Sequence, residues 1–469
     1  MIFAKDQQIM TTVKPSIPKG TRDFSPVVIS KRNYLKAQLA KVFESFGFQP
    51  IETPSFERSE TLLGRYGEEG DRLIFKILNS GEKIKNIDLQ ALQNGELSKF
   101  SNSLSQKALR YDLTVPFARY VAQYQNDIVF PFRRYQMQTV WRADRPQHGR
   151  FQEFLQCDAD VVGERSLWNE VEGILLYDRA FTMLDLKGVQ VHFNHRKILA
   201  GVAQFIGAES QFMDFTVALD KLSKIGKDGV IKLLHSQGFT SSAIERLKPF
   251  LSLEGNFETK LASVAKALEG IEIAEEGINE LKFIYNRLNL QSLKAVNLKF
   301  DITLARGLTY YTGLILEVMP PEGIKMGSIG GGGRYDNLTD FFGLNNTSGF
   351  GISFGFDRIF LVLEELNLFP SNLDEKVKLM FSNFGDDSVI FCFDQLIKLR
   401  DKHFPCELYP KPVKLKKQLN YANERSIPNV VILGSEELQK KVFILKNMVT
   451  GKQTEYPIDQ MFNILIDIA

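Results

Sequence analysis

Residues 132–162 read FRRYQMQTVWRADRPQHGRFQEFLQCDADVV, and their pattern is the most informative one for the fold class. Its first part, 132–141, is rich in β-forming residues, and its last part, 151–162, is apolar again. The residues between them, 142–149, are polar. Two β-rich runs joined by a polar segment predict an antiparallel hairpin with a long loop.

The loop of this hairpin carries Arg142, Arg145 and Arg150 beside Asp144, and Phe154 follows it. Guanidinium groups bind phosphates as planar forks, and an aromatic ring offers a face to a base. The pattern therefore suits a bound nucleoside triphosphate. For an isolated arginine cluster, however, a solvated charged loop is the better interpretation.

Upstream of the hairpin, apolar residues recur at helical spacing across 30–46, and Gly47 is a natural helix stop. Pro50 and Pro54 bracket an extended segment. Further strands are expected at 73–78 and 108–113.

Downstream, we expect an amphipathic helix over 164–186 and a strand over 189–194. Residues 205–297 are rich in Leu, Ala, Lys and Glu at helical spacing and contain little that suggests chemistry, which favours a helical insertion. Strands rich in Gly and Tyr return over 298–354. The sequence pattern changes once more at 365–375, after which strands alternate with helical stretches. We expect a domain boundary there, followed by a small α/β domain.

A second informative segment is GISFGFDRI, residues 351–359. Gly351 and Gly355 flank a bulky strand, and Arg358 follows Asp357. Glycine allows a ligand to approach the backbone, and an arginine can stack on an aromatic ring system. Alone the segment decides little, because glycine in a strand often marks a bulge.

Together the two segments resemble class II aminoacyl-tRNA synthetases. Arg142 followed by the loop and by Arg150-x-x-x-Phe154 resembles motif 2, and residues 355–358 resemble motif 3. The segment GFQPIETP, residues 47–54, is similar to motif 1, which forms the dimer interface in that family. Three motifs in the family's order are far more specific than any one of them.

Further segments resemble the histidyl-tRNA synthetase family, most closely its eukaryote-like branch. They are IPKGTRDFSP (17–26), LRYDLTVPFARYVA (109–122), QCDADVVG (156–163), LARGLTYYTG (304–313) and GGGGRYDNL (330–338). The resemblance implies an α+β fold: a class II catalytic domain with an antiparallel sheet and flanking helices, a helical insertion, and a C-terminal α/β anticodon-binding domain. The catalytic domain would occupy 1–200 and 298–368, the insertion 201–297, and the anticodon-binding domain 374–469.

The resemblance also implies a histidine site. Its residues would be Asp112, Leu113, Thr114, Arg142, Gln156, Asp160, Arg306, Tyr310 and Tyr311. Asp112, Thr114 and Gln156 would hold the α-amino group, while Asp160 and Tyr311 would meet the imidazole. A carboxylate on one ring nitrogen and a hydroxyl on the other fix orientation and tautomer, and so reject analogues. A solvent-facing strand position is the alternative for Asp160, but the surrounding run CDADVV would make an unpaired carboxylate costly.

The implied catalytic residues are Arg306 and Arg142. In the family, the arginine matched by Arg306 contacts the histidine carboxylate and the α-phosphate, so it would stabilise charge as pyrophosphate leaves. A lone Arg-Gly pair would otherwise be read as a surface turn. ATP would be bound by Arg142, Arg150, Phe154 and Arg358, together with Mg²⁺.

Two positions depart from the family pattern. Position 309 is Thr where the family more often has Asp, and position 152 is Gln where many relatives carry a second loop arginine. Both departures concern the contacts on the pyrophosphate side.

The segment LKKQLNYANERSIPNVVILG, residues 415–434, resembles the family's anticodon-binding domain. Lys411, Lys414, Lys416 and Lys417 lie near Tyr421 in the sequence, a combination that suits RNA phosphates and base stacking. Surface lysines are more often only solvated. Of these, Lys414, Lys416 and Lys417 are the candidate transfer-RNA contacts.

The expected function is ATP-dependent attachment of L-histidine to tRNA(His) through histidyl-adenylate, with release of AMP and diphosphate. The expected partners are tRNA(His), L-histidine, ATP and a second copy in a homodimer. A non-catalytic paralogue is improbable because Arg142, Arg306, Arg358 and the C-terminal domain are retained. A class II synthetase for proline, threonine or glycine is disfavoured by Asp160 and the Tyr310-Tyr311 pair.

Composition agrees with a folded multidomain enzyme. The chain has 469 residues, with 44% hydrophobic and 24% charged residues, which is near the globular average. The chain has 58 Lys and Arg against 56 Asp and Glu, so its net charge is close to zero. A polyanion would therefore have to bind at a local basic surface. The three scattered cysteines form no CxxC pair. Without a secretory signal or a long apolar run, a cytoplasmic, non-membrane protein is expected.

Overall fold

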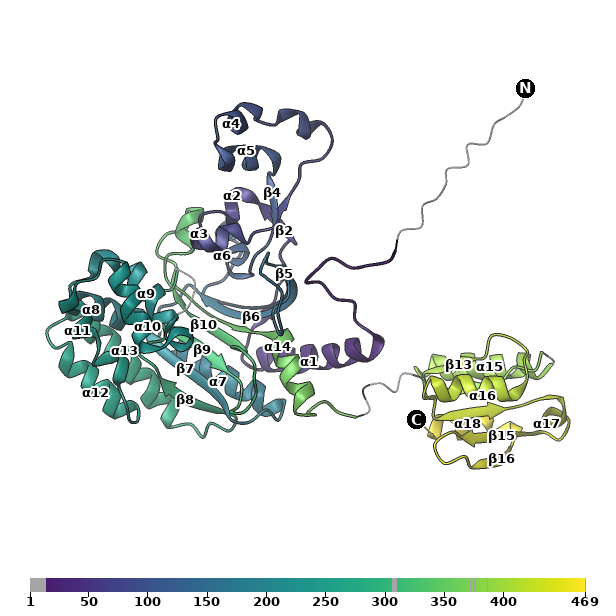
Figure 1. The fold of residues 1–469 in the computed structure, drawn as a ribbon. Coiled ribbons are helices and arrows are strands. Elements are labelled where there is room, and N and C mark those ends of the chain that lie inside the picture. The colour runs from purple at the N-terminus through teal and green to yellow at the C-terminus, as the bar shows by residue number, and fades with distance from the viewer. Residues whose placement is uncertain (1–13, 306–309, 372, 374–376, 386, 469) are drawn as a thin grey trace, which may run out of the picture. The chain divides into compact units, whose positions relative to one another are not determined.

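A computed structural model describes residues 14–305, 310–371, 373, 377–385 and 387–468 (Figure 1). The chain forms two compact units, one containing Arg32–Leu368 and one containing Phe369–Ala469. The predicted α+β class is confirmed: the larger unit contains a mostly antiparallel sheet and a run of helices, and the smaller unit is an α/β fold.

The larger unit is built on an eight-stranded sheet with the order β1-β5-β6-β11-β10-β9-β7-β8. Its strands are β1 (Gln49–Pro50), β5 (Phe132–Trp141), β6 (Glu153–Val162), β7 (Val189–His195), β8 (Val296–Phe300), β9 (Leu314–Met319), β10 (Gly330–Tyr335) and β11 (Gly349–Phe354). The edge pairs β1–β5 and β7–β8 are parallel, and all other pairs are antiparallel. The predicted hairpin is confirmed, since β5 and β6 pair along their whole length from Phe132↔Val162 to Trp141↔Glu153.

The two faces of this sheet differ in polarity. Successive strand residues point to opposite faces, so Gln156, Asp158 and Asp160 share one face of β6. The other face is covered by α1 (Pro26–Ser45) and α7 (Trp168–Met183). Rings from both helices pack on Phe354 of β11, at 5.5 Å from Phe43 of α1 and 4.6 Å from Tyr177 of α7. The polar face is thereby left for a site.

The segments before the hairpin were only partly predicted. The helix expected over 30–46 is α1, which begins four residues earlier and is followed by Gly47 at φ +79°. The strands expected over 73–78 and 108–113 are much shorter, because β3 is Lys76–Ile77 and β4 is Lys107–Leu109. With β2 (Phe56–Arg58) they form a three-stranded sheet.

Short helices surround this small sheet. They are α2 (Ser59–Leu62), α3 (Gly67–Arg72), η1 (Gly81–Asn86), α4 (Leu89–Gln93), α5 (Leu97–Leu104) and α6 (Thr114–Gln123). Most have eight residues or fewer, which is too few for a recognisable helical period, so they could not be predicted from the sequence.

Between β7 and β8 the chain is helical, as predicted. The elements are α8 (Arg196–Ile206), η2 (Glu209–Gln211), α9 (Phe212–Asp220), α10 (Leu222–Ser236), α11 (Ser241–Leu247), η3 (Phe250–Ser252), α12 (Phe257–Ala267) and α13 (Glu272–Asn289). Figure 1 shows them gathered in one cluster beside β7 and β8. After β10 follow η4 (Thr339–Phe342) and, after β11, α14 (Phe356–Glu365). No helix in the described part of the chain is long and apolar enough to span a bilayer.

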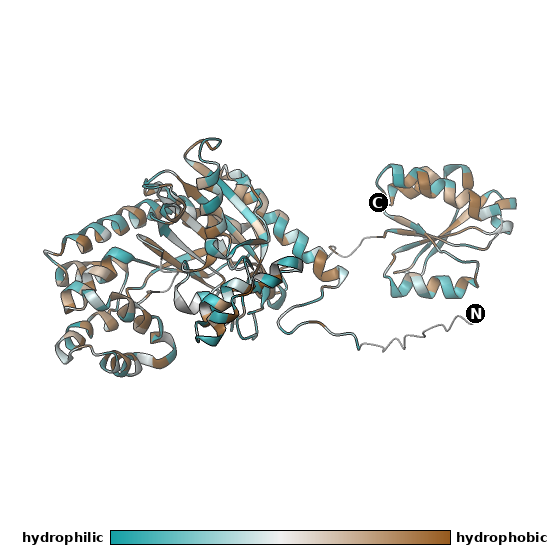
Figure 2. Cartoon of the chain, turned by 90° about the horizontal axis from the view of Figure 1, so that it is seen from above, coloured by the Kyte–Doolittle hydropathy of each residue, from teal (hydrophilic) through white to brown (hydrophobic). Residues whose placement is uncertain are grey.

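The smaller unit has a five-stranded sheet with the order β13-β12-β14-β15-β16. Its elements are β12 (Leu379–Phe381), α15 (Asp387–Asp401), β13 (Cys406–Leu408), α16 (Leu415–Glu424), β14 (Asn429–Ile432), α17 (Ser435–Gln439), β15 (Val442–Asn447), β16 (Gln453–Pro457), η5 (Ile458–Gln460) and α18 (Met461–Asp467). Figure 2 shows the sheet between helices on both sides.

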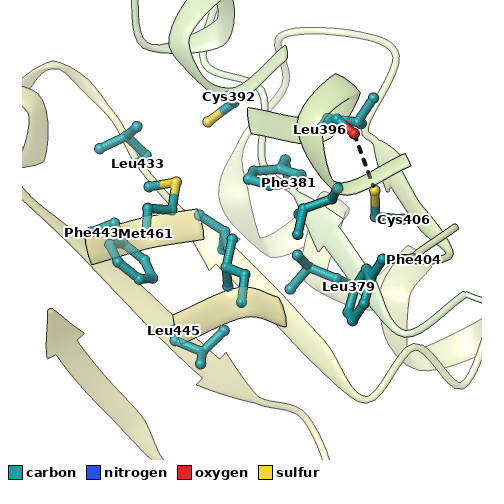
Figure 3. Close-up of a cluster of buried hydrophobic side chains, with 13 residues drawn as sticks. Leu379, Phe381, Cys392, Leu396, Phe404, Cys406, Leu433, Phe443, Leu445 and Met461 are labelled. Carbon is teal, nitrogen blue, oxygen red and sulfur yellow. Dashed lines mark hydrogen bonds between the residues drawn. The ribbon is translucent and has the colours of Figure 1, made fainter. Parts of the chain in front are cut away.

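Alternation along the strands of the smaller unit produces a core on each side of the sheet. Phe381 and Val431 pack with residues of α15 and α18, whereas Met380 and Val430 pack with Ala422 of α16. Figure 3 shows the first of these cores, in which the buried Cys406 thiol lies 3.7 Å from the carbonyl oxygen of Leu396. All three cysteines of the chain are buried and unbonded to one another.

Candidate active site

The polar face of the large sheet borders a cavity beside the hairpin. The side chains lining it come from α6, β6, β10, β11 and the segment before β9. They include Thr114, Asp158, Asp160, Tyr311, Tyr335 and Ser353. Segments more than 200 positions apart in the sequence therefore meet at one polar site.

Asp160 is the most firmly held carboxylate of the cavity. It is 2% exposed, so the alternative of a solvent-facing strand residue is wrong. Its Oδ1 accepts a 2.6 Å hydrogen bond from the Tyr335 hydroxyl, and its Oδ2 lies 2.8 Å from a guanidinium nitrogen of the fully buried Arg134. Burial raises the pKa of Asp160, and the nearby Arg134 charge opposes that rise.

Gly351 is required by this arrangement. It faces Asp160 across β11 and β6, and a Cβ atom there would lie 2.0 Å from Asp160 Oδ1. Similarly, a Cβ on Gly333 would meet the ring of Tyr311 at 2.9 Å. The glycines of these strands thus make room for side chains of the site, where the sequence had suggested close approach of a ligand to the backbone.

Asp112 offers an oxygen that lacks a partner. Its Oδ1 accepts hydrogen bonds from the Tyr66 hydroxyl at 2.8 Å and from the amide of Val115 at 3.2 Å. Its Oδ2 is buried and has no hydrogen-bond partner among the described residues. Burial raises the pKa of Asp112, although the hydrogen bond from Tyr66 lowers it. An unpaired buried carboxylate oxygen is costly, so it suits a cationic ligand group.

The two residues after Asp112 differ in whether their side chains line the cavity. Thr114 is the first residue of α6 and lines the cavity. The side chain of Leu113 is fully buried in the core, and its carbonyl oxygen accepts a 3.4 Å hydrogen bond from Arg134. A contact of Leu113 with a ligand would therefore involve its backbone.

Gln156 and Arg142 lie side by side at the base of the hairpin loop. Arg142 donates from Nη2 to Gln156 Oε1 at 3.3 Å and from Nε to the carbonyl oxygen of Tyr111 at 3.0 Å. Its guanidinium lies 4.3 Å from the ring centre of Tyr111 and 5.2 Å from that of Phe154. Among the described residues it forms no ion pair with a carboxylate, although its charge lowers the pKa of the nearby Asp112 against the effect of burial.

The hairpin loop is held by the segment that resembles motif 3. Arg358 donates from Nε to the carbonyl oxygen of Gly149 at 2.8 Å and from Nη1 to that of Ser328 at 2.6 Å. Arg150, in contrast, is half-exposed and lies 3.7 Å from Asp144. Arg358 thus holds the loop that carries Arg150, while the side chain of Arg150 stays half-exposed beside Asp144.

Asp357 anchors the start of α14, a role that the sequence did not reveal. Its Oδ1 lies 2.8 Å from Arg22 and 2.5 Å from Arg32, and its Oδ2 accepts from the amide of Leu155 at 3.0 Å. One carboxylate therefore joins the N-terminal segment, α1 and β6 next to Arg358. Gln152, one of the two departures, donates instead to the carbonyl oxygen of Asp144 at 3.1 Å.

Tyr310 and Tyr311 lie together, with ring centres 5.0 Å apart. Burial raises the pKa of both hydroxyls, so both remain protonated hydrogen-bond donors. Arg306 and Thr309, the other residues singled out in this segment, lie outside the described residues. Their roles stay predictions.

The sequence did not single out Arg134, Tyr335 or Asp158, although all three belong to the site. A signal was present: Arg134 and Gln136 alternate along β5 with the same parity as Asp158 and Asp160 on β6, and these positions pair directly. Polar residues at alternate positions on two central strands indicate a polar face that is not simply solvent-exposed.

In the smaller unit, Lys414, Lys416 and Lys417 are exposed around the start of α16. Tyr421, considered for base stacking, is engaged by other side chains. Its hydroxyl accepts a 2.8 Å hydrogen bond from Arg425, and its ring lies 5.3 Å from that of Tyr409.

Comparison with known proteins assigns both units. A family model described as Histidyl-tRNA synthetase matches residues 20–85 and 88–359, and one described as Anticodon binding domain matches 394–468. The histidine–tRNA ligase of Christiangramia forsetii is 56% identical over 441 residues, which span 94% of this chain and 97% of the relative. That of Flavobacterium johnsoniae is 52% identical over 471 residues, spanning 97% and 99%.

Solved structures agree with this assignment. A histidyl-tRNA synthetase from Nostoc sp. PCC 7120 superposes with a TM-score of 0.77 at 26% identity, covering 98% of this chain and all of that one. A protein from Bacillus halodurans C described as an ATP phosphoribosyltransferase regulatory subunit/histidyl-tRNA synthetase has a TM-score of 0.67 at 22% identity, covers 87% and 97%, and shows the fold alone. Since the relatives named here are bacterial, the expected affiliation with a eukaryote-like branch is not borne out.

Proposed function

The chain belongs to the histidyl-tRNA synthetase family, and we propose that the cavity lined by Thr114 and Asp160, together with the neighbouring Asp112, is its histidine site. The reaction is the ATP-dependent attachment of L-histidine to its transfer RNA through histidyl-adenylate, with release of AMP and diphosphate. The observation that carries the site assignment is the buried Oδ2 of Asp112, which has no hydrogen-bond partner among the described residues and lies near a cavity of polar side chains.

Each part of histidine has a matching group in this assignment. The α-ammonium pairs with Asp112 Oδ2 and is held further by Thr114 and Gln156. The imidazole lies between the cavity carboxylates and the hydroxyl of Tyr311, which donates because its pKa is raised. The carboxylate of histidine points toward Arg142, whose guanidinium has no acidic partner among the described residues.

ATP lies against the hairpin loop. Arg142 faces the α-phosphate, Arg150 the outer phosphates, and Phe154 and Arg358 enclose the adenine. The support is that Arg358 and the loop are already in contact through Gly149. A ligand phosphate would therefore bind guanidinium groups on a loop that is held in place by a hydrogen bond to α14.

In the first step the histidine carboxylate attacks the α-phosphate, forming the acyl-phosphate bond as the bond to pyrophosphate breaks. Arg142 and Arg306 balance the growing negative charge, since guanidinium groups fixed beforehand stabilise a transition state without reorganisation. In the second step the terminal adenosine hydroxyl of the transfer RNA takes the histidyl group, and AMP leaves. No covalent intermediate with a protein side chain is needed.

Magnesium enters this account as part of the MgATP substrate. In the described part of the chain, no group of three His, Cys, Asp or Glu side chains could hold a metal ion. Mg²⁺ is commonly held by nucleotide phosphates and water with one or two carboxylates. Mg²⁺ would therefore be bound mainly through the phosphates of the nucleotide.

We also propose that the enzyme is a homodimer formed around the motif 1 segment. There, β1 is an edge strand of the large sheet, paired on one side only, to β5. Beside it lies a cavity of about 420 Å³ between α1, β1 and β5, lined by Ala37, Ala40 and Met137 among others. An edge strand paired on one side, next to a cavity that is lined by apolar side chains together with Lys36 and Glu52, suits a second copy of the chain.

The smaller unit is the proposed reader of transfer RNA, acting in the cytoplasm, with Lys414, Lys416 and Lys417 near the RNA phosphates. The experiment is to charge transfer RNA with labelled histidine, using the full chain and a chain that ends at Leu368. The full chain should charge tRNA(His), while the shortened chain should retain histidine-dependent pyrophosphate exchange and charge poorly. Equal charging by both would remove this role from the smaller unit.

A further inference from the structure

The N-terminal segment, residues 17–24, lies against the loop of the β5–β6 hairpin, which carries Arg142 and Arg150 of the proposed ATP site. The backbone amide of Gln152 in this loop donates a 2.9 Å hydrogen bond to the carbonyl oxygen of Gly20. Gly20 has φ +85°, and a Cβ atom on it would lie 2.6 Å from Gln152 Cγ. Glycine is favoured at this position for both reasons, and it allows the segment and the loop to touch through their backbones.

Arg22 connects the same loop to the first turn of α14. Its guanidinium carbon lies 3.3 Å from the centre of the Phe151 ring. Its Nη2 lies 2.8 Å from Oδ1 of Asp357, which is 335 positions later in the chain. A planar guanidinium can stack on an aromatic ring and at the same time donate to a carboxylate. One side chain therefore contacts both of the segments between which the proposed ATP site lies.

Asp357 is shared by two arginines that differ in their contact with the loop. Arg32 of α1 lies 2.5 Å from the same Oδ1. Both guanidinium groups also lie near the ring of Phe24, Arg32 at 4.3 Å and Arg22 at 5.0 Å. The second ring near Arg32 is Phe356 of α14, at 4.8 Å, whereas the second ring near Arg22 belongs to the hairpin loop. Comparison of the two arginines therefore separates the effect of the loop contact from that of the ion pair with Asp357.

The loop contact is adjacent to the residues assigned to ATP. Phe151 directly follows Arg150, and Phe154 is three positions further along the chain. The side chain of Arg150 is half-exposed and lies 3.7 Å from Asp144, so this ion pair contributes little to its position. The place of Arg150 is set mainly by the backbone of the loop. Accurate placement matters, because a displacement of about 1 Å can lower a rate by about 100-fold.

We propose that Arg22 is a positioning residue for ATP, which holds the loop carrying Arg150 in place by stacking on Phe151 and pairing with Asp357. Arg22 itself does not contact the nucleotide in this proposal, and it acts through the ring of Phe151. The inference rests on the proposed function, because it assumes that ATP binds between the hairpin loop and α14. It gives the N-terminal segment a part in substrate binding.

The test is Arg22→Gln, measured as pyrophosphate exchange with ATP and histidine varied in turn. The variant loses both the stacking plane and the charge, so the loop should become less well placed. Its KM for ATP should rise about tenfold. Its KM for histidine should stay within about twofold of the wild-type value, because Arg22 makes no contact with the residues of the histidine cavity. A thermal unfolding curve of each variant gives Tm for comparison.

A conservative variant distinguishes the two contacts of Arg22. Arg22→Lys keeps a charge for Asp357 but lacks the plane that stacks on Phe151, so it should recover most of the Tm while the KM for ATP stays raised. Phe151→Leu should raise the KM for ATP in the presence of Arg22. Combined with Arg22→Gln, it should add little further, because the two residues act through one contact. A residue that contributes only to stability would show no such coupling in the KM for ATP.

The matched control is Arg32→Gln. Arg32 is only 8% exposed and pairs with the same oxygen of Asp357, so its loss should lower Tm. Its KM for ATP should stay within about twofold of the wild-type value, because Arg32 does not reach the loop. Equal rises in the KM for ATP from Arg32→Gln and Arg22→Gln would overturn the inference, since the effect would then come from Asp357 alone.

A second variant of the N-terminal segment tests the inference without removing a charge. Gly20→Ala places a Cβ atom against Gln152, so it should separate the segment from the loop and raise the KM for ATP. Lowered Tm values for Gly20→Ala and Arg22→Lys, with an unchanged KM for ATP in both, would assign the segment to structure alone. If the wild type itself showed no histidine-dependent exchange, the proposed function would fail instead, so the two failures are distinguishable.

Discussion

The guanidinium Nε of Arg358 donates a 2.8 Å hydrogen bond to the carbonyl oxygen of Gly149, which lies 209 positions earlier in the chain. Gly149 is in the loop of the β5–β6 hairpin, and Arg358 is in the first turn of α14. The contact joins the segments that resemble motifs 2 and 3, between which the proposed ATP site lies.

Replacement of this arginine should therefore affect ATP before it affects histidine. Arg358→Gln loses the charge and one arm of the fork that reaches Gly149 and Ser328. A charge-assisted hydrogen bond is worth about 1.5–3 kcal/mol, which corresponds to about a 10- to 100-fold rise in the KM for ATP. Pyrophosphate exchange with ATP and histidine varied in turn measures both constants. A rise in the KM for histidine alone would contradict this prediction, because it would place Arg358 in the histidine site and not in the ATP site.

Asp160 should matter for both stability and substrate binding. Asp160→Ala leaves Arg134 as a fully buried, unpaired charge, and loss of one partner from such a pair costs about 3–5 kcal/mol of unfolding free energy. Asp160→Asn keeps an acceptor for the Tyr335 hydroxyl and should be destabilised less. In both variants the KM for histidine should rise while that for ATP stays within about twofold. Denaturant unfolding together with exchange kinetics checks this; equal stabilities would argue that Arg134 does not depend on Asp160.

Arg306 is assigned to charge that develops on the α-phosphate, although it lies outside the described residues. Loss of one preorganised donor typically lowers kcat by about 10²–10³-fold. Arg306→His should therefore suppress pyrophosphate exchange, while transfer of histidine from preformed adenylate falls less, because pyrophosphate has already left. Arg306→Lys should restore only part of the activity, since a point charge cannot bridge a carboxylate and a phosphate as a planar fork does. Equal losses in exchange and transfer would make Arg306 a structural residue.

The proposed dimer can be disrupted at the cavity beside β1. Ala37 is exposed on α1 and lines that cavity, so Ala37→Arg adds bulk and charge without disturbing the core of the monomer. Light scattering should give the mass of a dimer for the wild type. For the variant it should give a larger monomer fraction, and this fraction should increase as the protein is diluted. A wild type that is monomeric and active at assay concentration would contradict the proposal.

Pattern and spacing were sufficient to predict the large elements. The hairpin, α1, α7 and β7 have long, regular patterns, and their predicted bounds differ from the observed ones by a few residues at most. The short helices between β3 and β4 were missed because no helical period develops within a few residues. Gly351 could not be understood from the sequence, since its cause is the carboxylate of Asp160 on the neighbouring strand.

The candidate site was predictable only where a residue resembled a known motif. Asp112, Gln156 and Asp160 were found in that way, whereas Arg134 and Tyr335 were not, because their importance lies in the pairs they form with Asp160. Such pairs depend on which strands become neighbours, and β6, β10 and β11 are far apart in the sequence. The spacing of residues along the sequence does not show which strands are neighbours in the sheet, so these pairs could not be predicted from it.

The central claim is that this cavity activates histidine and no other amino acid. The most direct measurement is ATP–pyrophosphate exchange by the full chain with each of the twenty amino acids supplied separately. We expect exchange that depends on histidine alone, since the imidazole is the side chain that can satisfy the buried carboxylates and the Tyr311 hydroxyl together. Exchange with proline, threonine or glycine instead of histidine, or no exchange with any amino acid, would contradict it.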